Sequence, residues 1–211
     1  METLSLKGNP FSPYTRAVRI TLLEKGIPFN FVELRPPDLQ EPSHLALHPF
    51  GKMPVLEVEG SAIFETTAIL RYVDEHFSGS VRLQPANTRD RARMAQWVSA
   101  ACAYIYPNAF TKVFVQQALL PKFGMETDTA LVQEGLETTK THLETLSQAL
   151  ENGTLAGNGR LTLADIVCAS ILDPLRHLES GQDLLNSHSR VTKWLETLSK
   201  RESFSATAMP A

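Results

Sequence analysis

Hydrophobic and polar positions follow two different periods in the first third of the chain. Short runs that alternate, or are apolar throughout, predict four β-strands at residues 3–7, 29–34, 55–58 and 62–64. Apolar residues at helical spacing predict helices at residues 13–25, 42–47 and 66–77. Residues 35–40, with two adjacent prolines, predict a loop, and Glu59-Gly60 predicts a hairpin turn. The order βαβ, short α, ββα predicts a thioredoxin-like α/β domain whose mixed sheet has its first two strands parallel.

The pattern changes after residue 78 and becomes entirely helical. Small and polar residues at 79–86 predict a linker between a first domain at 1–78 and a second at 87–211. Four helices are expected in the second domain, at residues 88 to about 117, 128–150, 163–178 and 191–200. Pro107 is a candidate bend in the first of them. We therefore expect an all-α C-terminal helical bundle domain.

Composition and charge exclude several classes of function. The 211 residues are 43% hydrophobic and 20% charged, with a net charge of -3, which argues against an electrostatic nucleic-acid surface. Cys102 and Cys168 lie in apolar, small-residue stretches, so we expect buried free thiols rather than a disulfide framework or a metal site. Neither a secretory signal nor an apolar run of the roughly 20 residues that span a bilayer is visible. These features predict a cytoplasmic protein without metal or membrane partners.

Residues 8–16, Gly-Asn-Pro-Phe-Ser-Pro-Tyr-Thr-Arg, join the first predicted strand to the first helix. Ser12 occupies the predicted helix cap and Pro13 the first helical position. Unpaired amides and the positive end of the helix dipole meet there, so the site favours an anion such as a thiolate. Ser-Pro-Tyr-Thr also resembles the Cys-Pro-Tyr-Cys turn of glutaredoxins with both sulfurs replaced by hydroxyls. An ordinary helix cap is the alternative role for Ser12.

Two further segments of the first domain carry candidate binding groups. Pro54 directly precedes a predicted strand, and a cis Met53–Pro54 bond would present the backbone of Met53 to an extended peptide. Glu65-Thr66 opens a predicted helix. An acid followed by a hydroxyl is normal helix-capping composition, but the pair could also bind an ammonium group and a carboxylate carried on one carbon, as in a γ-glutamyl group.

Thr162 and Asp165 have the spacing of a helix capping box at the start of a very apolar helix. Since Ile166 to Leu172 is too apolar to be exposed, we expect Asp165 to be buried and bound to its own helix start. The pattern predicts a role in folding and not in catalysis.

These four segments together, in this order, resemble the cytosolic glutathione transferase family over essentially the whole chain. Ser12-Pro13 with residues 19–26 looks like the serine-type classes, such as phi, zeta and tau. Residues 49–54 look like the loop that binds the glutathione backbone, and residues 65–69 like the γ-glutamyl anchor, with Thr66 where the family usually has Ser.

The resemblance implies a homodimeric enzyme that activates the thiol of glutathione through Ser12 for attack on an apolar electrophile. The implied glutathione-binding residues are Gln40, Lys52, Met53, Pro54, Glu65 and Thr66. Gln40 aligns where phi-like members have a basic residue for the glycyl carboxylate, a contact that Lys52 could take over. The implied electrophile pocket draws on Phe11, Tyr14, Tyr104, Tyr106, Phe110 and Phe114.

Other functions stay open on the same residues. A glutathione-dependent isomerase or dehalogenase would share the motifs and differ in its pocket. A disulfide reductase normally needs a thiol at position 12, and a non-enzymatic binding module often loses the thiolate-site residues. A two-fold interface is expected at the mixed-charge helix 66–77, which carries Arg71, Asp74 and Glu75, and at the start of the helix after Asn87. Phe50 resembles the aromatic key that some classes of the family insert into the partner subunit, and a place in the core is the alternative role for Phe50.

Overall fold

The protein is represented by a computed structural model that describes residues 4–77, 81–153, 155 and 160–210. Contacts divide it into two units, Met1–Leu83 together with Glu202–Ala211, and Gln84–Arg201. The predicted linker at 79–86 begins outside the described residues, and its described part divides between the units at Leu83.

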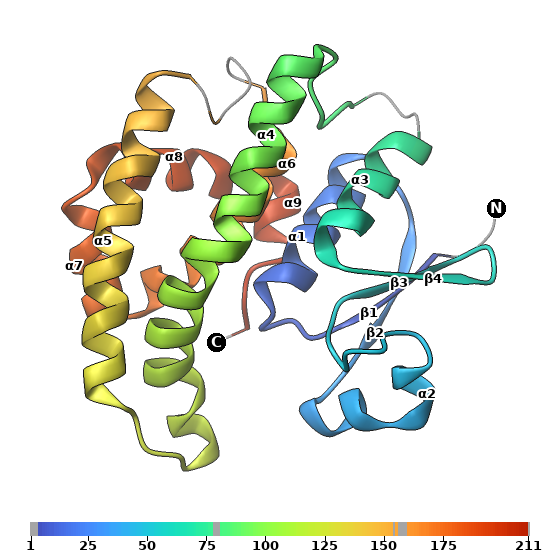
Figure 1. The fold of residues 1–211 in the computed structure, drawn as a ribbon, viewed down its shortest axis with the longest axis horizontal. Coiled ribbons are helices and arrows are strands. Elements are labelled where there is room, and N and C mark those ends of the chain that lie inside the picture. Colours follow the sequence, from blue (N-terminus) through green and yellow to red (C-terminus); the bar gives the residue numbers. More distant parts are fainter. Residues whose placement is uncertain (1–3, 78–80, 154, 156–159, 211) are drawn as a thin grey trace. The chain divides into compact units, whose positions relative to one another are not determined.

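The first unit is built on a four-stranded sheet in the order β2-β1-β3-β4. The strands are β1 (Leu4–Gly8), β2 (Phe29–Glu33), β3 (Val55–Val58) and β4 (Ser61–Phe64). β1 pairs in parallel with β2 and antiparallel with β3, as the sequence predicts. Helices α1 (Pro13–Glu24) and α3 (Thr66–His76) lie side by side on one face, and α2 (Pro42–Leu45) lies beyond the other (Figure 1).

The turn from β1 into α1 depends on a close approach between a glycine and a threonine. A Cβ atom at Gly8 would lie 2.4 Å from Oγ1 of the buried Thr15. Such contacts are far inside van der Waals distance, so only glycine fits where the strand meets the helix. This fixes where α1 begins, and therefore where Ser12 lies.

A buried ion pair holds the other ends of α1 and α3. The Lys25 ammonium lies 3.2 Å from Oδ1 of Asp74 and donates to the carbonyl oxygen of Val81 at 3.0 Å, and neither charged side chain is more than 4% exposed. The same Oδ1 accepts the backbone N–H of Leu83 at 2.9 Å. These contacts attach residues 81–83 to the first unit.

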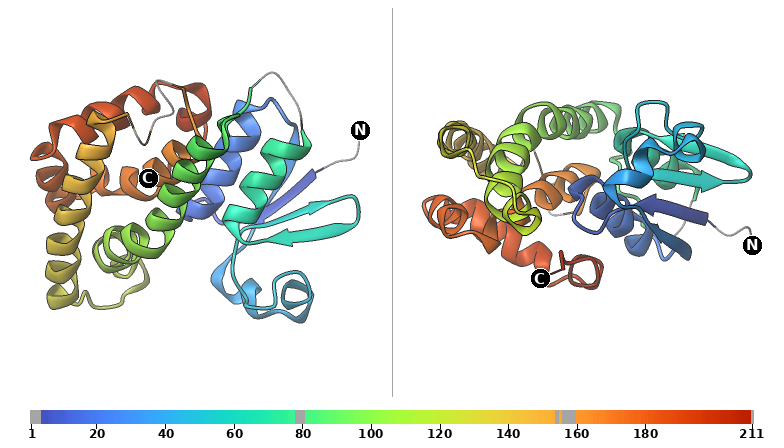
Figure 2. Two further views of the ribbon diagram at one scale, coloured as in Figure 1. Left: turned by 45° about the horizontal axis from the view of Figure 1, so that its top comes forward. Right: turned by 90° about the horizontal axis from the view of Figure 1, so that it is seen from below.

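The second unit consists of helices packed around α6 (Leu163–Leu172), every residue of which is buried. The others are α4 (Thr88–Ala100), a π-helix η2 (Ala101–Leu119), the short η3 (Pro121–Phe123), α5 (Thr129–Glu151), η4 (Asp173–His177), α7 (Glu179–Asn186) and α8 (Ser189–Ser199). η2 and α5 run side by side along much of their length (Figure 2).

Several expected elements differ in the structure. Residues 36–40 form a short 3₁₀-helix η1 (Pro36–Gln40) instead of a loop. The helix predicted over 88–117 consists of α4 and the π-helix η2, with Pro107 inside the latter. The helix predicted over 163–178 ends as α6 at Leu172, because Pro174 lacks an amide proton and a 3₁₀ turn follows.

The end of the chain also differs from the expected boundary. We expected residues 87–211 to form one helical domain, but α9 (Glu202–Ser205) belongs to the first unit and packs on α1. The guanidinium of the buried Arg16 donates to the carbonyl oxygen of Phe204 at 3.4 Å, and the Ser203 hydroxyl donates to Glu24. A buried arginine on α1 therefore finds its acceptor in the last residues of the chain.

Candidate active site

Ser12 is the N-cap of α1, as predicted. Its backbone is extended, and its hydroxyl oxygen accepts the backbone N–H of Thr15 at 3.2 Å. A serine hydroxyl has one proton to donate and two lone pairs, and the cap uses one lone pair. The capping role is therefore compatible with donation of the hydroxyl proton to an external acceptor. The first turn of α1 carries no acidic residue, so no side-chain carboxylate in that turn offsets the positive end of the helix dipole.

Asn9 organises the turn that presents Ser12. Its side-chain oxygen accepts the backbone N–H of Phe11 at 2.9 Å, and its amide donates to the carbonyl oxygen of Leu34 at 2.8 Å. Its own carbonyl oxygen accepts the N–H of Ser12 at 3.0 Å. An asparagine between Gly8 and a proline is the local signal for such a turn, since Asn bonds the backbone two residues on.

The segment from His48 to Pro54 forms a tight loop ahead of β3. The Met53–Pro54 peptide bond is cis, as expected. Gly51 has φ +57, and a Cβ atom there would lie 3.0 Å from Nε2 of Gln40. Gln40 and Lys52, the two candidates for the glycyl carboxylate, are both exposed. Since the Gln40 amide lies beside Gly51, the residue before Lys52, both candidates lie at the same loop. Nε2 of the His44 ring donates to the carbonyl oxygen of Lys52 at 2.8 Å, and this hydrogen bond attaches the loop to α2.

Glu65 and Thr66 lie at the N-terminus of α3, as predicted. Glu65 is exposed and has φ 70, in the left-handed region that side-chain-bearing residues rarely adopt. Non-glycine residues in such conformations cost about 1–3 kcal/mol and cluster at ligand clamps. Thr66 is the first helical residue and is buried. The carboxylate of Glu65 thus lies beside the unpaired amides of the first turn of α3.

The predicted pocket residues differ widely in exposure. Phe11 and Tyr14 of the first unit are half-buried. On η2, Tyr104 is 63% exposed, whereas Phe110 and Phe114 are 5% and 3% exposed. Tyr106 is half-buried, and burial raises the pKa of its hydroxyl. The rings of Tyr106, Phe110 and Phe114 stack in a row with centroids 5.3 Å apart, so they support one another within η2. Their role in binding an electrophile stays a prediction.

Asp165 takes the predicted capping position at the start of α6. Its Oδ2 accepts the backbone N–H of Thr162 at 2.9 Å and the Thr162 hydroxyl at 2.7 Å, and its Oδ1 accepts the indole N–H of Trp194 at 3.1 Å. Asp165 is 1% exposed. Burial raises the pKa of its carboxyl, against the opposing effect of these hydrogen bonds. These three contacts are internal to the helical unit, in agreement with a role in folding.

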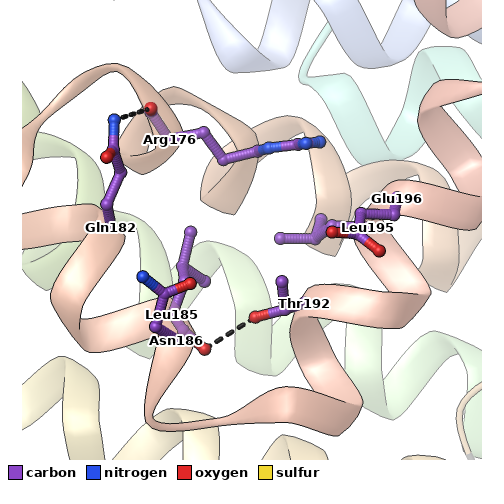
Figure 3. Close-up of a pocket in the computed structure, with 7 residues that line it drawn as sticks. All are labelled: Arg176, Gln182, Leu185, Asn186, Thr192, Leu195 and Glu196. Atoms are coloured by element: carbon purple, nitrogen blue, oxygen red, sulfur yellow. Dashed lines mark hydrogen bonds between the residues drawn. The ribbon is translucent and has the colours of Figure 1, made fainter.

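A pocket of the helical unit lies among η4, α7 and α8 (Figure 3). Three of its polar side chains are engaged with neighbouring groups. Gln182 donates to the backbone carbonyl oxygen of Arg176 at 2.9 Å, and Thr192 donates to that of Leu185 at 2.6 Å. Arg176 also pairs with Asp173 at 3.4 Å. Its volume of about 260 Å³ is below the range of about 300–1,000 Å³ typical of ligand pockets, so we assign it no ligand.

Comparison with known proteins identifies the family. The model of the glutathione S-transferase N-terminal domain matches residues 6–81, and that of the C-terminal domain matches residues 110–202. Glutathione S-transferase 3 of Zea mays is 32% identical over 215 residues, which cover 98% of this chain and 94% of that protein. The chain belongs to the glutathione transferase family. Transferase activity and glutathione as co-substrate, both expected from the sequence, follow from this membership.

Solved structures of the family have the same fold. Glutathione transferase F2 of Populus trichocarpa has a TM-score of 0.89 and 27% identity, with 97% of this chain and 96% of that chain covered. A glutathione S-transferase I bound with lactoylglutathione has a TM-score of 0.86 and 25% identity, with 98% of both chains covered. The thioredoxin-like first part and the helical second part that the sequence predicts are therefore confirmed.

Among the described residues, no helix is long and apolar enough to cross a bilayer. No group of three or more His, Cys, Asp or Glu side chains in the described part of the chain could hold a metal ion. Cys102 and Cys168 are free thiols. Cys168 is buried, as expected, and burial raises the pKa of its thiol, whereas Cys102 is only half-buried.

Proposed function

We propose that Ser12 activates the thiol of glutathione by donating its hydroxyl proton to the thiolate. The observation that carries this proposal is the geometry of the cap: Ser12 Oγ faces the first turn of α1 and already accepts from Thr15, while its O–H is left to donate. A free thiol has a pKa of about 8.5, and the thiolate is the nucleophile. A hydroxyl donor and a helix N-terminus both favour the charged form, so they lower that pKa.

The remaining parts of glutathione are assigned to the loops that flank α2 and α3. We place the γ-glutamyl ammonium at the Glu65 carboxylate and the α-carboxylate at Thr66, where unpaired helix amides supply donors. The backbone of Met53 pairs with the cysteinyl unit. Gln40 and Lys52 bind the glycyl carboxylate, a proposal supported by the contact of Gln40 with the Gly51 turn.

The thiolate then attacks an apolar electrophile, and the protein contributes positioning and charge stabilisation rather than covalent chemistry. The relative bound with lactoylglutathione supports binding of a substituted glutathione at this fold. Detectable conjugation of chlorodinitrobenzene without isomerisation of maleyl diacids separates a transferase from an isomerase on the same scaffold.

Turnover of the Ser12→Ala variant tests this proposal. Loss of the donor is expected to lower the conjugation rate by about ten- to a thousandfold. Ser61→Ala is the matched control, since Ser61 is an exposed serine at the start of β4 in the same unit. Wild-type rates in Ser12→Ala would remove Ser12 from the mechanism, and equal losses in both variants would indicate damage to the fold.

We also propose a homodimer in the cytoplasm. The support for a two-fold interface is the exposed mixed-charge face of α3, where Arg71 and Glu75 lie 3.8 Å apart, and of early α4, where Arg93 and Asp90 lie 3.6 Å apart. Phe50 is 70% exposed, which suits an aromatic side chain covered by a partner subunit. Two free cysteines suit a reducing compartment. Light scattering that gives one 23.4 kDa chain at micromolar concentration would exclude the dimer.

A further inference from the structure

His48 lies where the two glutathione-binding segments of the first unit meet. It is 2% exposed, and its ring packs on Phe64 with centroids 4.8 Å apart. Phe64 ends β4 and is followed directly by Glu65. The backbone carbonyl of His48 accepts the N–H of Gly51 at 2.9 Å, so the same residue also begins the loop that carries Lys52 and Met53.

Further rings complete this cluster. His44 stacks on His48 with centroids 6.2 Å apart, and Phe50 meets both His48 and Phe64 edge-on at 6.3 Å. Displacement of the His48 ring would therefore change the support of Phe64, and with it the strained backbone of Glu65.

Three charged or titratable groups act on the His48 ring. Glu65 at the start of α3 favours a proton on the ring, whereas His44 of α2 and Lys52 of the loop oppose one. Burial is the largest effect, and it lowers the pKa of His48. The ring is thus neutral at pH 7 and gains its proton only in acid.

Resting on the proposed glutathione site, we propose that His48 is a positioning residue for the γ-glutamyl anchor, and that its protonation weakens glutathione binding. The neutral ring packs on Phe64 and leaves the Glu65 carboxylate to the ligand ammonium. An imidazolium in the same place attracts that carboxylate and repels the ammonium. Linkage makes this effect reciprocal: protonation of His48 weakens ligand binding, and bound ligand disfavours protonation by the same free energy. Bound ligand therefore lowers the pKa of His48.

The test is the affinity for S-methylglutathione, whose thioether cannot ionise, measured by calorimetry between pH 5 and 7. The carboxylates and amine of the ligand keep their charges in this range. If bound ligand lowers the pKa of His48 by about one, the dissociation constant rises as the pH falls towards 5 and reaches the full increase of about tenfold only at a pH below both pKa values. His48→Phe keeps a ring against Phe64 without a titrating group and is expected to remove this dependence. His76→Asn, an exposed histidine of α3, is the control and keeps it.

A second readout does not depend on the variant folding. In wild-type protein, the imidazole resonance of His48 followed by NMR is expected to titrate at lower pH when S-methylglutathione is bound. An unchanged titration, or a His48→Phe variant with the wild-type pH dependence, would overturn the role of His48. Absence of S-methylglutathione binding at pH 7 in the wild type would instead overturn the proposed function itself.

Discussion

Replacing Asp165 by alanine tests whether the capping network of α6 is structural. The variant loses three acceptor contacts, two from Thr162 and one from Trp194. The Thr162 hydroxyl retains the carbonyl oxygen of Leu155 at 3.5 Å as an acceptor, so two N–H donors lose their partners. The Thr162 N–H is buried, and the half-buried Trp194 can reach water.

The expected loss follows from these donors. An unsatisfied buried donor costs about 1–3 kcal/mol, so the variant should lose about 2–4 kcal/mol of unfolding free energy with the smaller contribution from Trp194. In a protein of this size, that corresponds to a fall in Tm of roughly 4–16 °C. Differential scanning calorimetry measures it, and affinity for glutathione is followed on the protein that remains folded.

Thr162→Ser is the matched control, because serine keeps the hydroxyl and caps as well as threonine. It should remain within about 0.5 kcal/mol of the wild type. An Asp165→Ala variant with unchanged Tm and lost turnover would contradict the structural role and place Asp165 in the reaction.

Three further predictions concern other named contacts. Asp74→Ala leaves the buried Lys25 ammonium without its carboxylate, so urea denaturation should show that the unfolding free energy falls by about 3–5 kcal/mol. A fall of less than about 1 kcal/mol would show that water reaches the ammonium. Gly51→Ala puts a side-chain-bearing residue at φ +57 and its Cβ atom against Gln40, which costs the loop about 1–2 kcal/mol. Calorimetry should therefore show weaker binding of glutathione, and an unchanged affinity would exclude this loop from the site. Burial raises the pKa of the Asp165 carboxyl, so at a pH between the two pKa values the folded state holds a proton that the unfolded state has released. The unfolding free energy of the wild type should therefore fall, relative to that of Asp165→Asn, as the pH rises from about 4 through the folded pKa. An unfolding free energy that rises over this range would contradict the direction of the pKa shift.

The order of elements in the first unit could be predicted because local signals determine it. Periods of two and of 3.6 residues separate the strands from the helices, and Ser12, Pro54, Glu65 and Thr162 each mark the start of an element. Gln40 ends η1, but the candidates Ser12, Pro54, Glu65 and Thr66 lie at or beside these element starts. Their chemistry is therefore visible in the sequence.

Contacts between distant segments had no such signal. Asp74 belongs to the mixed-charge surface that the sequence predicts for helix 66–77, but this prediction is wrong for Asp74, because its carboxylate is buried against the Lys25 ammonium. Arg16 is likewise buried, and its acceptor is 188 residues away at Phe204. The packing of His48 on Phe64 likewise depends on how two loops meet, which no residue pattern encodes.

The central claim is that Ser12 stabilises the thiolate of bound glutathione. The most direct measurement is the ultraviolet absorbance of that thiolate as a function of pH, in the wild type, Ser12→Ala and the Ser61→Ala control. We predict that the bound thiol of the wild type and of Ser61→Ala titrates about one to two pH units below the value of about 8.5 for a free thiol, and that Ser12→Ala returns it towards that value. The same midpoint in all three proteins, with glutathione bound, would contradict the account.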